Sequence, residues 1–593
     1  MDSQQPVDYS NWSHDSLIRR VEELEYRLKH STSKFKSYTS PAPRPKHTRT
    51  ERKFDPSKYS TRHIALKLAY LGQRYNGFEH HANNETPLPT IEEELYKALS
   101  KARLIYPGQG HAAKPGEVNW EGCEYSKCGR TDRGVSAFGQ VISLRVRSNR
   151  PLARRRDKGA ETKIREGQDS YSTLVREETL EVAAEPSDSE SNPGPSDLHF
   201  NDPDCEDYLS FDPVKDELPY SQILNRILPD DIRILAWSPT LPVDFSARFS
   251  CRERRYKYFF TQPAFAPVPG IAGLLPKQGQ GERKRIGWLD IDAMREGARH
   301  FIGLHDFRNF CKVDPSKQIT NFQRRIFHAD IEEIDPMKAP VSYFGGPEFR
   351  ALDTEEMTSK GADARRVHPP LKVYTFTLHG SAFLWHQVRH MVAILFLVGQ
   401  GLEMPSLIPQ LLDVDSNPAK PQYEMASDAP LVLWDCIFPC ADDEGRKDAM
   451  EWVYVGDNTG VESGASKVTD GKFGPGCLID NVWSIWRSKK IDEVLAGSLL
   501  DLIAGQGRRD HASDASDISH MGSSRKLSQK VFRGGDMAKT SGKYVPVLQK
   551  PRTETVEIIN QKYADRKMFE TNEESKEGPG QTFKVENDAA LDP

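Results

Sequence analysis

The stretch from Cys128 to Val146 reads CGRTDRGVSAFGQVISLRV and decides how the rest of the chain is interpreted. Its one carboxylate, Asp132, lies among two arginines and two glycines in a short segment. Apolar residues at 141, 142, 144 and 146 follow directly and predict a strand. A glycine-containing loop before a strand can hold one acid rigidly at the edge of a sheet. Asp132 is therefore a candidate nucleophile or electrostatic stabiliser.

The arginines beside Asp132 predict that its carboxyl has a lowered pKa and is an anion at neutral pH. The alternative, from spacing alone, is a surface turn with an Arg–Asp pair and no chemistry. The two interpretations differ in what surrounds the acid, and the surroundings come from other parts of the chain.

Composition indicates a folded core diluted by disordered segments. Of 593 residues, 37% are hydrophobic and 28% are charged, and the net charge is −5. The charges are segregated, because 31–62 is basic whereas 177–217 is acidic. An acidic loop of this kind can conceal a basic face from the net charge, so an RNA partner is not excluded.

Several classes of protein find no support in the sequence. The eight cysteines form no Cys-x-x-Cys pair, so we expect no metal site. No run of eighteen apolar residues or apolar signal region occurs, which predicts a chain of a reducing, intracellular compartment without a membrane partner. Glycine-rich phosphate-binding patterns are also lacking, so we expect no cofactor.

Patterning divides the chain into segments. Residues 1–62 are predicted to be an N-terminal helix and a basic linker. The stripe Leu17, Val21, Leu24 and Leu28 suits a short coiled coil, or docking on a partner or on RNA. Residues 63–150 and 216–260 form a first α+β half, interrupted by a disordered acidic insertion at 151–215. The remaining predicted segments are a second half at 261–440, a loop and covering helix at 441–504, and a polar tail at 505–593.

The two halves contain similar sets of elements. In the first, a strand at 64–70 precedes a helix that begins at a capping box formed by Thr90 and Glu93. In the second, the strongest helix is 383–399, with an apolar stripe on one side. The fold class is therefore α+β, with two similar halves that face each other across a cleft.

The segment Gly129–Val135 resembles the catalytic loop of the TruA family of tRNA pseudouridine synthases, whose pattern is Gly-Arg-Thr-Asp-x-Gly-Val. Four more segments resemble the motifs of that family and occur in the family's order: Tyr70–Phe78, Phe245–Tyr258, His305–Phe310 and Phe383–Met391. Together they cover most of 63–440, so the resemblance implies the pseudouridine synthase fold, in which two similar α+β halves with antiparallel sheets flank a basic catalytic cleft.

The resemblance also implies roles for individual residues. Asp132 corresponds to the nucleophilic aspartate, Tyr256 to the tyrosine that stacks on the base, and Arg389 to the arginine that pairs with the aspartate. Arg130 and Arg389 would keep Asp132 ionised and contact the target nucleotide or its phosphate. Periodicity alone instead favours a half-buried strand aromatic for Tyr256 and an exposed cation for Arg389. We interpret the pair at 305 and 306 as a hydrogen-bonded turn rather than a general base.

The implied activity is isomerisation of uridine to pseudouridine in the anticodon stem-loop of tRNA, without metal or cofactor, by a homodimer. Whether Asp132 attacks the ribose or deprotonates it is open. The segment 309–314 is most similar to the eukaryotic branch that modifies positions 38 and 39. Alternatives are the branch acting at 27 and 28, a synthase of other RNAs, and a tRNA-binding protein without activity. Nucleus and cytoplasm are both open, since the basic cluster at 44–53 is interrupted.

Overall fold

The computed structural model of the chain has two compact units, residues 1–58 and 59–593. The residues it describes are 13, 16, 18–23, 54–81, 86–106, 118–152, 211–267, 274–276, 283–334, 372–439, 450–457, 471–506 and 529–574. In the first unit, 18–23 are helical, as expected for the N-terminal helix. Leu17, Leu24 and Leu28 of the expected stripe lie outside the described residues.

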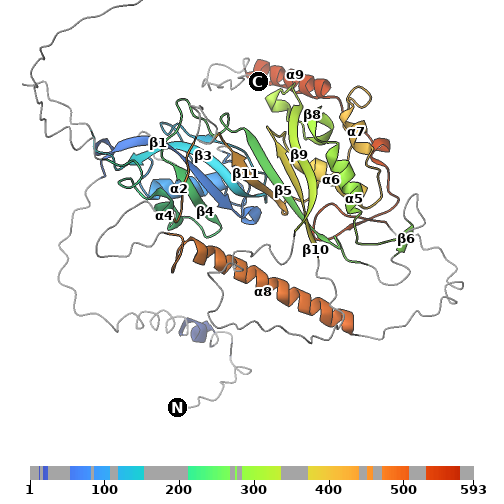
Figure 1. The fold of residues 1–593 in the computed structure, drawn as a ribbon, viewed down its shortest axis with the longest axis horizontal. Helices are drawn as coiled ribbons and strands as arrows, with labels where there is room; N and C mark the ends of the chain where they lie inside the picture. Colours follow the sequence, from blue (N-terminus) through green and yellow to red (C-terminus); the bar gives the residue numbers. More distant parts are fainter. Residues whose placement is uncertain are drawn as a thin grey trace, which may run out of the picture. The chain divides into compact units, whose positions relative to one another are not determined.

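A ten-stranded sheet organises the second unit (Figure 1). Its order is β12–β4–β1–β3–β11–β5–β10–β9–β8, and β2 pairs with β3 beside this path. The bounds are β1 Ser60–Tyr70, β2 Ser126–Lys127, β3 Ser136–Ser148, β4 Ile232–Ser238, β5 Glu253–Gln262, β8 Gly303–Asp306, β9 Gln323–Ile334, β10 Lys372–Gly380, β11 Leu431–Ile437 and β12 Val453–Tyr454.

Two antiparallel parts of this sheet meet at one parallel pair, β3 with β11, where Val432 lies opposite Ser136. The other neighbours along the order are antiparallel. The predicted α+β fold class with antiparallel halves is thereby confirmed. The division differs at β5, which was assigned to the first half. It pairs with β10 and β11, so it belongs to the second part of the sheet.

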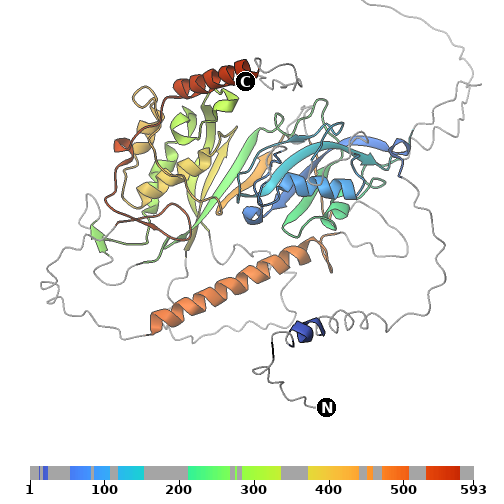
Figure 2. The ribbon, with the colours of Figure 1, turned by 180° about the vertical axis from the view of Figure 1, so that it is seen from behind.

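Helices pack on both parts of the sheet, and Figure 2 shows them from behind. The Thr90 hydroxyl accepts a hydrogen bond from the Glu93 backbone at 3.2 Å, which confirms the predicted start of α2. The helices are α2 Ile91–Lys101, α4 Tyr220–Asn225, α5 Ile291–Arg299, α6 Gln387–Gly399, α7 Leu407–Leu412, α8 Leu478–Gly505 and α9 Val556–Glu574. The 3₁₀ turns are η1 Pro56–Lys58, η2 Gly72–Arg74, η4 Arg308–Phe310, η5 Pro315–Lys317 and η9 Val547–Gln549.

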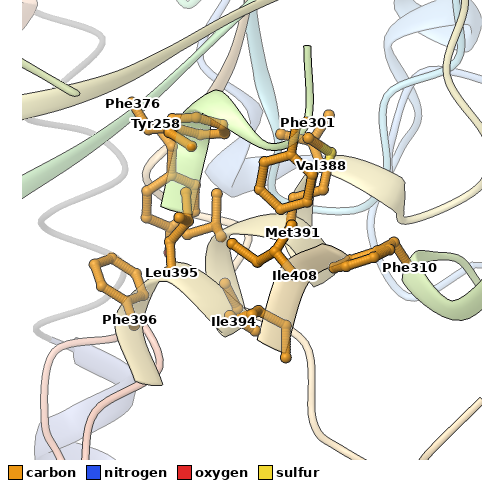
Figure 3. Packing of buried hydrophobic residues seen from close by; sticks show 14 of the residues in the cluster. Tyr258, Phe301, Phe310, Phe376, Val388, Met391, Ile394, Leu395, Phe396 and Ile408 are labelled. Carbon is orange, nitrogen blue, oxygen red and sulfur yellow. The ribbon is translucent and has the colours of Figure 1, made fainter. Parts of the chain in front are cut away.

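Each part of the sheet has its own hydrophobic core. One core joins α2 to β1, β3 and β4. The other surrounds α6, where Met391, Leu395 and Phe396 pack among aromatic side chains from β5, β10 and the segment around η4 (Figure 3). The predicted one-sided stripe on α6 is too narrow, because every residue of the helix except Arg389 is buried. Tyr256 of β5 packs against both cores.

The C-terminal segment corrects the prediction of a polar tail. Two short strands, β13 Gln529–Val531 and β14 Lys539–Ser541, form a hairpin. Val531, Phe532, Val547 and Val556 from this region are buried in the core around α6. Their apolar clusters are short and separated by polar residues, so they have no periodicity that a sequence pattern could detect.

Two further predicted segments can be compared with the structure. Helix α8 forms as expected, but none of its residues is buried, so it does not act as the predicted covering helix. Of the predicted insertion, 153–210 lie outside the described residues. Its last residues, 211–215, form a turn whose Pro213 carbonyl accepts a hydrogen bond from Arg62 at 2.9 Å. No helix in the described part of the chain is long and apolar enough to cross a bilayer.

Candidate active site

Asp132 lies in the turn between β2 and β3, and the residue before it anchors this turn. The Thr131 hydroxyl hydrogen-bonds the Tyr70 hydroxyl of β1 at 2.8 Å. The Thr131 carbonyl accepts from the Phe78 backbone amide at 3.1 Å. These contacts tie the loop to the first-strand motif Tyr70–Phe78. The two motifs that resemblance singled out therefore build one rigid support for the acid.

Glycines allow the close approaches that this turn requires. A β-carbon at Gly77 would lie 2.8 Å from the Thr131 carbonyl oxygen. At Gly134, φ is +80° and a β-carbon would lie 2.5 Å from the Asp428 carboxylate. Since only glycine adopts such positions without strain, Gly77 of the first-strand motif and Gly134 of the loop motif have a structural cause.

Three side chains at the start of α6 surround the Asp132 carboxylate. Arg389 places Nη1 3.9 Å from Oδ2 of Asp132. His386 places Nε2 3.4 Å from the same oxygen. The Trp385 side chain also acts to lower the pKa of this carboxyl. The fourth family-like segment, Phe383–Met391, is thus brought onto the catalytic-loop motif across 257 positions of sequence, from Asp132 to Arg389.

The pKa of Asp132 is raised, chiefly because burial disfavours its charge, while the nearby Arg389 guanidinium opposes the rise. The predicted lowering by adjacent arginines is therefore wrong. Arg130 turns away and pairs its Nε with Glu79 Oε2 at 3.0 Å. Arg133 is exposed. Neighbours in a turn point in different directions, so sequence adjacency did not identify the cation beside the acid.

Arg389 is held in place on both sides of its guanidinium. It is the one residue of α6 that is not buried. Its Nε donates to the Ala426 carbonyl at 2.8 Å. Its Nη2 lies 4.0 Å from Asp428 Oδ1. The helix thus packs into the core while this one cation faces Asp132, as its position off the apolar stripe predicted.

His386 was not among the predicted site residues. It occupies the left-handed region with φ 62°, immediately before α6. Such strain in a residue other than glycine is concentrated at functional sites. Burial, with a contribution from Arg389, lowers the pKa of His386 to about 4, so the imidazole is neutral at neutral pH. Its place in the Phe383–Met391 motif, three residues before Arg389, was the available signal.

Tyr256 lies on β5, opposite Leu378 of β10 and Leu433 of β11. It meets the Phe383 ring edge-on, with 5.0 Å between centroids. Burial raises its pKa, and the Asp132 charge adds to the rise. The structure thus brings Tyr256, Asp132 and the start of α6 together, and leaves Arg130 with Glu79.

The cations next to Tyr256 in sequence have other partners. Arg254 donates to the Ser381 carbonyl at 2.7 Å and to the Cys128 carbonyl at 3.1 Å. Arg255 pairs with Glu253 at 2.5 Å. Lys257 lies over the Trp434 ring. These three neighbours in the strand are therefore engaged with groups other than Tyr256.

Segment 303–310 has structural contacts. His305 Nε2 lies 2.9 Å from the Ile302 carbonyl oxygen. Asp306 pairs with Arg308 Nη2 at 2.9 Å and accepts from the Arg308 backbone amide. His305 and Asp306 thus have structural hydrogen bonds, but they lie in strand β8 and not in the turn that the sequence predicted.

Three buried thiols meet behind the catalytic loop. The sulfurs of Cys128, Cys251 and Cys436 lie within 4.8 Å of one another. Their segments are far apart in sequence, so spacing could not have predicted the cluster. Three thiols are one ligand short of the four of a structural zinc site, and we assign no metal to them.

Several known proteins named tRNA pseudouridine synthases are similar to this chain. Residues 298–439 match a family described as tRNA pseudouridine synthase. The chain is 36% identical to the Homo sapiens protein named tRNA pseudouridine(38/39) synthase, over 74% of this chain and 68% of the human protein. It is 37% identical to a Saccharomyces cerevisiae protein of the same name, over 73% and 72%. A Methanothrix thermoacetophila tRNA pseudouridine synthase A is 26% identical, over 59% and 74%.

Proposed function

Because the chain belongs to the TruA-type family of tRNA pseudouridine synthases, we propose that it isomerises uridine to pseudouridine in the anticodon stem-loop of tRNA, at positions 38 and 39. The reaction breaks the bond from uracil N1 to ribose C1′ and forms a bond from C5 to C1′. The proton on C5 is lost and N1 gains one, so composition does not change and no oxidant is consumed.

The observation that carries this proposal is the half-buried Asp132 carboxylate beside the Arg389 guanidinium, at 3.9 Å. A carboxylate that is poorly solvated is a better nucleophile or base than one in water, because little hydration must be removed when it reacts. The guanidinium favours the ionised form, because it opposes the rise that burial causes in the pKa of Asp132. This pairing supplies what either role of Asp132, attack on the ribose or its deprotonation, requires.

The base detached from the sugar must be held while it turns. Tyr256 supplies an aromatic ring beside Asp132, supported edge-on by Phe383. Stacking of a base on an aromatic ring contributes about 1–3 kcal/mol and accepts any base face. Arg389 and Arg130, whose side chain is 48% exposed, would contact the target nucleotide or its phosphate.

Two features support the choice of position. The Homo sapiens and Saccharomyces cerevisiae relatives carry positions 38 and 39 in their names. A homodimer that grips the stem through phosphates sets how far along the anticodon arm Asp132 reaches. From one binding position on the stem, Asp132 can reach neighbouring nucleotides better than nucleotides at both ends of the stem. Extrusion of a paired base costs a few kcal/mol, so a strengthened pair at 39 should slow reaction there more than at 38.

The proposal is tested by incubating the purified full chain with unmodified tRNA and mapping pseudouridine by base-specific chemical modification. We expect product at 38 and 39 only. Product confined to 27 and 28 would support the proposed reaction but contradict the proposed positions. Binding of tRNA without any product would instead indicate a tRNA-binding protein without activity.

A further inference from the structure

A cavity of about 640 Å³ opens beside the candidate active site. Two partners of Asp132, His386 and Arg389, line it, although Asp132 itself does not. The volume lies in the range of roughly 300–1,000 Å³ typical of ligand sites. Its charged lining comes from two parts of the chain: Lys312, Arg389, Lys420 and Glu424 around α6, and Arg533 and Lys539 from the C-terminal hairpin.

The lining carries a large surplus of positive charge. Glu424 is the one carboxylate among the lining residues, and Arg533 and Lys539 both pair with it. Lys312 lies over the Trp385 ring, 4.4 Å from its centroid. It has no ion pair with any carboxylate in the described part of the chain. Such a lining favours an anion with several oxygens.

Lys420 is a half-buried cation of this lining. Its Nζ lies 2.8 Å from His390 Nε2 and 2.8 Å from the Cys311 carbonyl oxygen. Neither partner is an anion. Burial lowers the pKa of Lys420 to about 8 and that of His390 to about 2. A poorly solvated positive charge without an anionic partner is stabilised when an anion enters the cavity.

The hairpin that supplies the other cations is firmly attached to the core. The Phe532 backbone exchanges two hydrogen bonds with the Gln400 side chain, at 2.8 and 2.9 Å. The Tyr258 hydroxyl donates to the Gly534 carbonyl at 2.9 Å. Gly534 has φ +76°, and a β-carbon there would lie 2.0 Å from the Tyr258 oxygen. These contacts therefore fix the position of the hairpin at the cavity wall.

We propose that the hairpin 529–541 and the start of α6 together form a second RNA contact, which binds backbone phosphates of the strand flanking the target nucleotide. This inference rests on the proposed function, because it concerns the part of the same RNA that flanks the target nucleotide. Arg389 joins the two regions, since it faces Asp132 and lines the cavity. An RNA strand that is bound both at the candidate active site and at this second contact would keep the target ribose against Asp132.

The test compares two double variants of the full chain that remove equal charge from the same segment. Arg533→Ala with Lys539→Ala removes the two cavity cations. Lys530→Ala with Lys543→Ala is the matched control, because both lysines are exposed and neither lines the cavity. Affinity for unmodified tRNA is measured at several salt concentrations, together with single-turnover rate at saturating tRNA and thermal unfolding.

We expect the cavity variant to bind tRNA roughly 5- to 20-fold more weakly. The slope of log affinity against log salt concentration should also be shallower by about 1–2, since each phosphate contact contributes about 0.7–0.9 to that slope. The single-turnover rate of this variant at saturating tRNA should also fall, because the target ribose is then held less firmly against Asp132. The control should match the wild type. Glu424→Gln, which removes the opposing carboxylate, should bind tRNA more tightly.

Equal affinity and slope in the cavity variant and the wild type would overturn the inference. So would an equal loss in cavity and control variants, which would indicate nonspecific charge. Both results are distinct from failure of the proposed function, in which the wild type itself makes no pseudouridine.

Discussion

Removing the Arg389 charge should move the pH at which the enzyme becomes active. Unit charges 3.9 Å apart interact by about 4 kcal/mol at an effective dielectric constant of about 20. That energy corresponds to an upper limit of about three pKa units for Asp132. Because the Asp132 side chain is 25% exposed, solvent screens part of it, and we expect Arg389→Gln to raise the pKa of Asp132 further by about one to two units.

The consequence is a displaced acid limb in the rate profile. Asp132 acts as an anion, so the single-turnover rate falls as pH falls through its pKa. In Arg389→Gln this fall should begin about one to two units higher than in the wild type. Part of the activity lost at neutral pH should then return in alkaline buffer. An acid limb at the wild-type pH would refute the electrostatic role of Arg389.

Two controls separate charge from geometry. Arg389→Lys keeps the charge but cannot contact Asp132, Asp428 and the Ala426 carbonyl together, so it should lower the rate without moving the acid limb. Arg145→Gln removes a surface cation that pairs with Glu124. It should change neither the rate nor the profile, and thermal unfolding of all three variants checks that they fold.

Three other predictions concern stability and base binding. Phe532→Ala should cost about 3–5 kcal/mol in urea unfolding, and a loss below about 1 kcal/mol would remove the C-terminal segment from the core. The unfolded state binds more protons than the folded one between the His386 pKa of about 4 and its ordinary value of 6.5. Stability should therefore fall as pH is lowered across this window, and less steeply in His386→Gln; equal slopes would contradict this assignment. Tyr256→Leu should weaken the single-turnover rate by about 5- to 150-fold through lost stacking, whereas Tyr256→Phe should stay within about tenfold, and equal losses would argue against stacking.

The main elements and the candidate acid could be predicted because their signals are local. Hydrophobic alternation gave β1, and Thr90 marked the start of α2. The glycines around Asp132 indicated a rigid loop, and Gly134, whose φ is +80°, accounts for one of them. The partnership with Arg389 depended on resemblance, since no spacing rule connects residues so far apart.

What sequence could not predict depends on long-range packing. The direction of the Asp132 pKa shift follows from burial and from which guanidinium lies near, neither of which is local. The trio of thiols forms where three separate segments cross. The C-terminal hairpin contributes only a few buried side chains, among them Phe532, within a polar segment. Each is fixed by neighbours from elsewhere in the chain.

The most direct measurement is pseudouridine formation by Asp132→Asn under single-turnover conditions with saturating tRNA. The change keeps the size of the side chain and removes its charge, so tRNA affinity, which comes mainly from phosphate contacts, should stay within about threefold. Because the raised pKa of Asp132 means that its charge is disfavoured in the folded state, stability should not fall. We predict tRNA binding without detectable product. Turnover at a tenth of the wild-type rate or more would contradict the assignment of Asp132 as the reacting group.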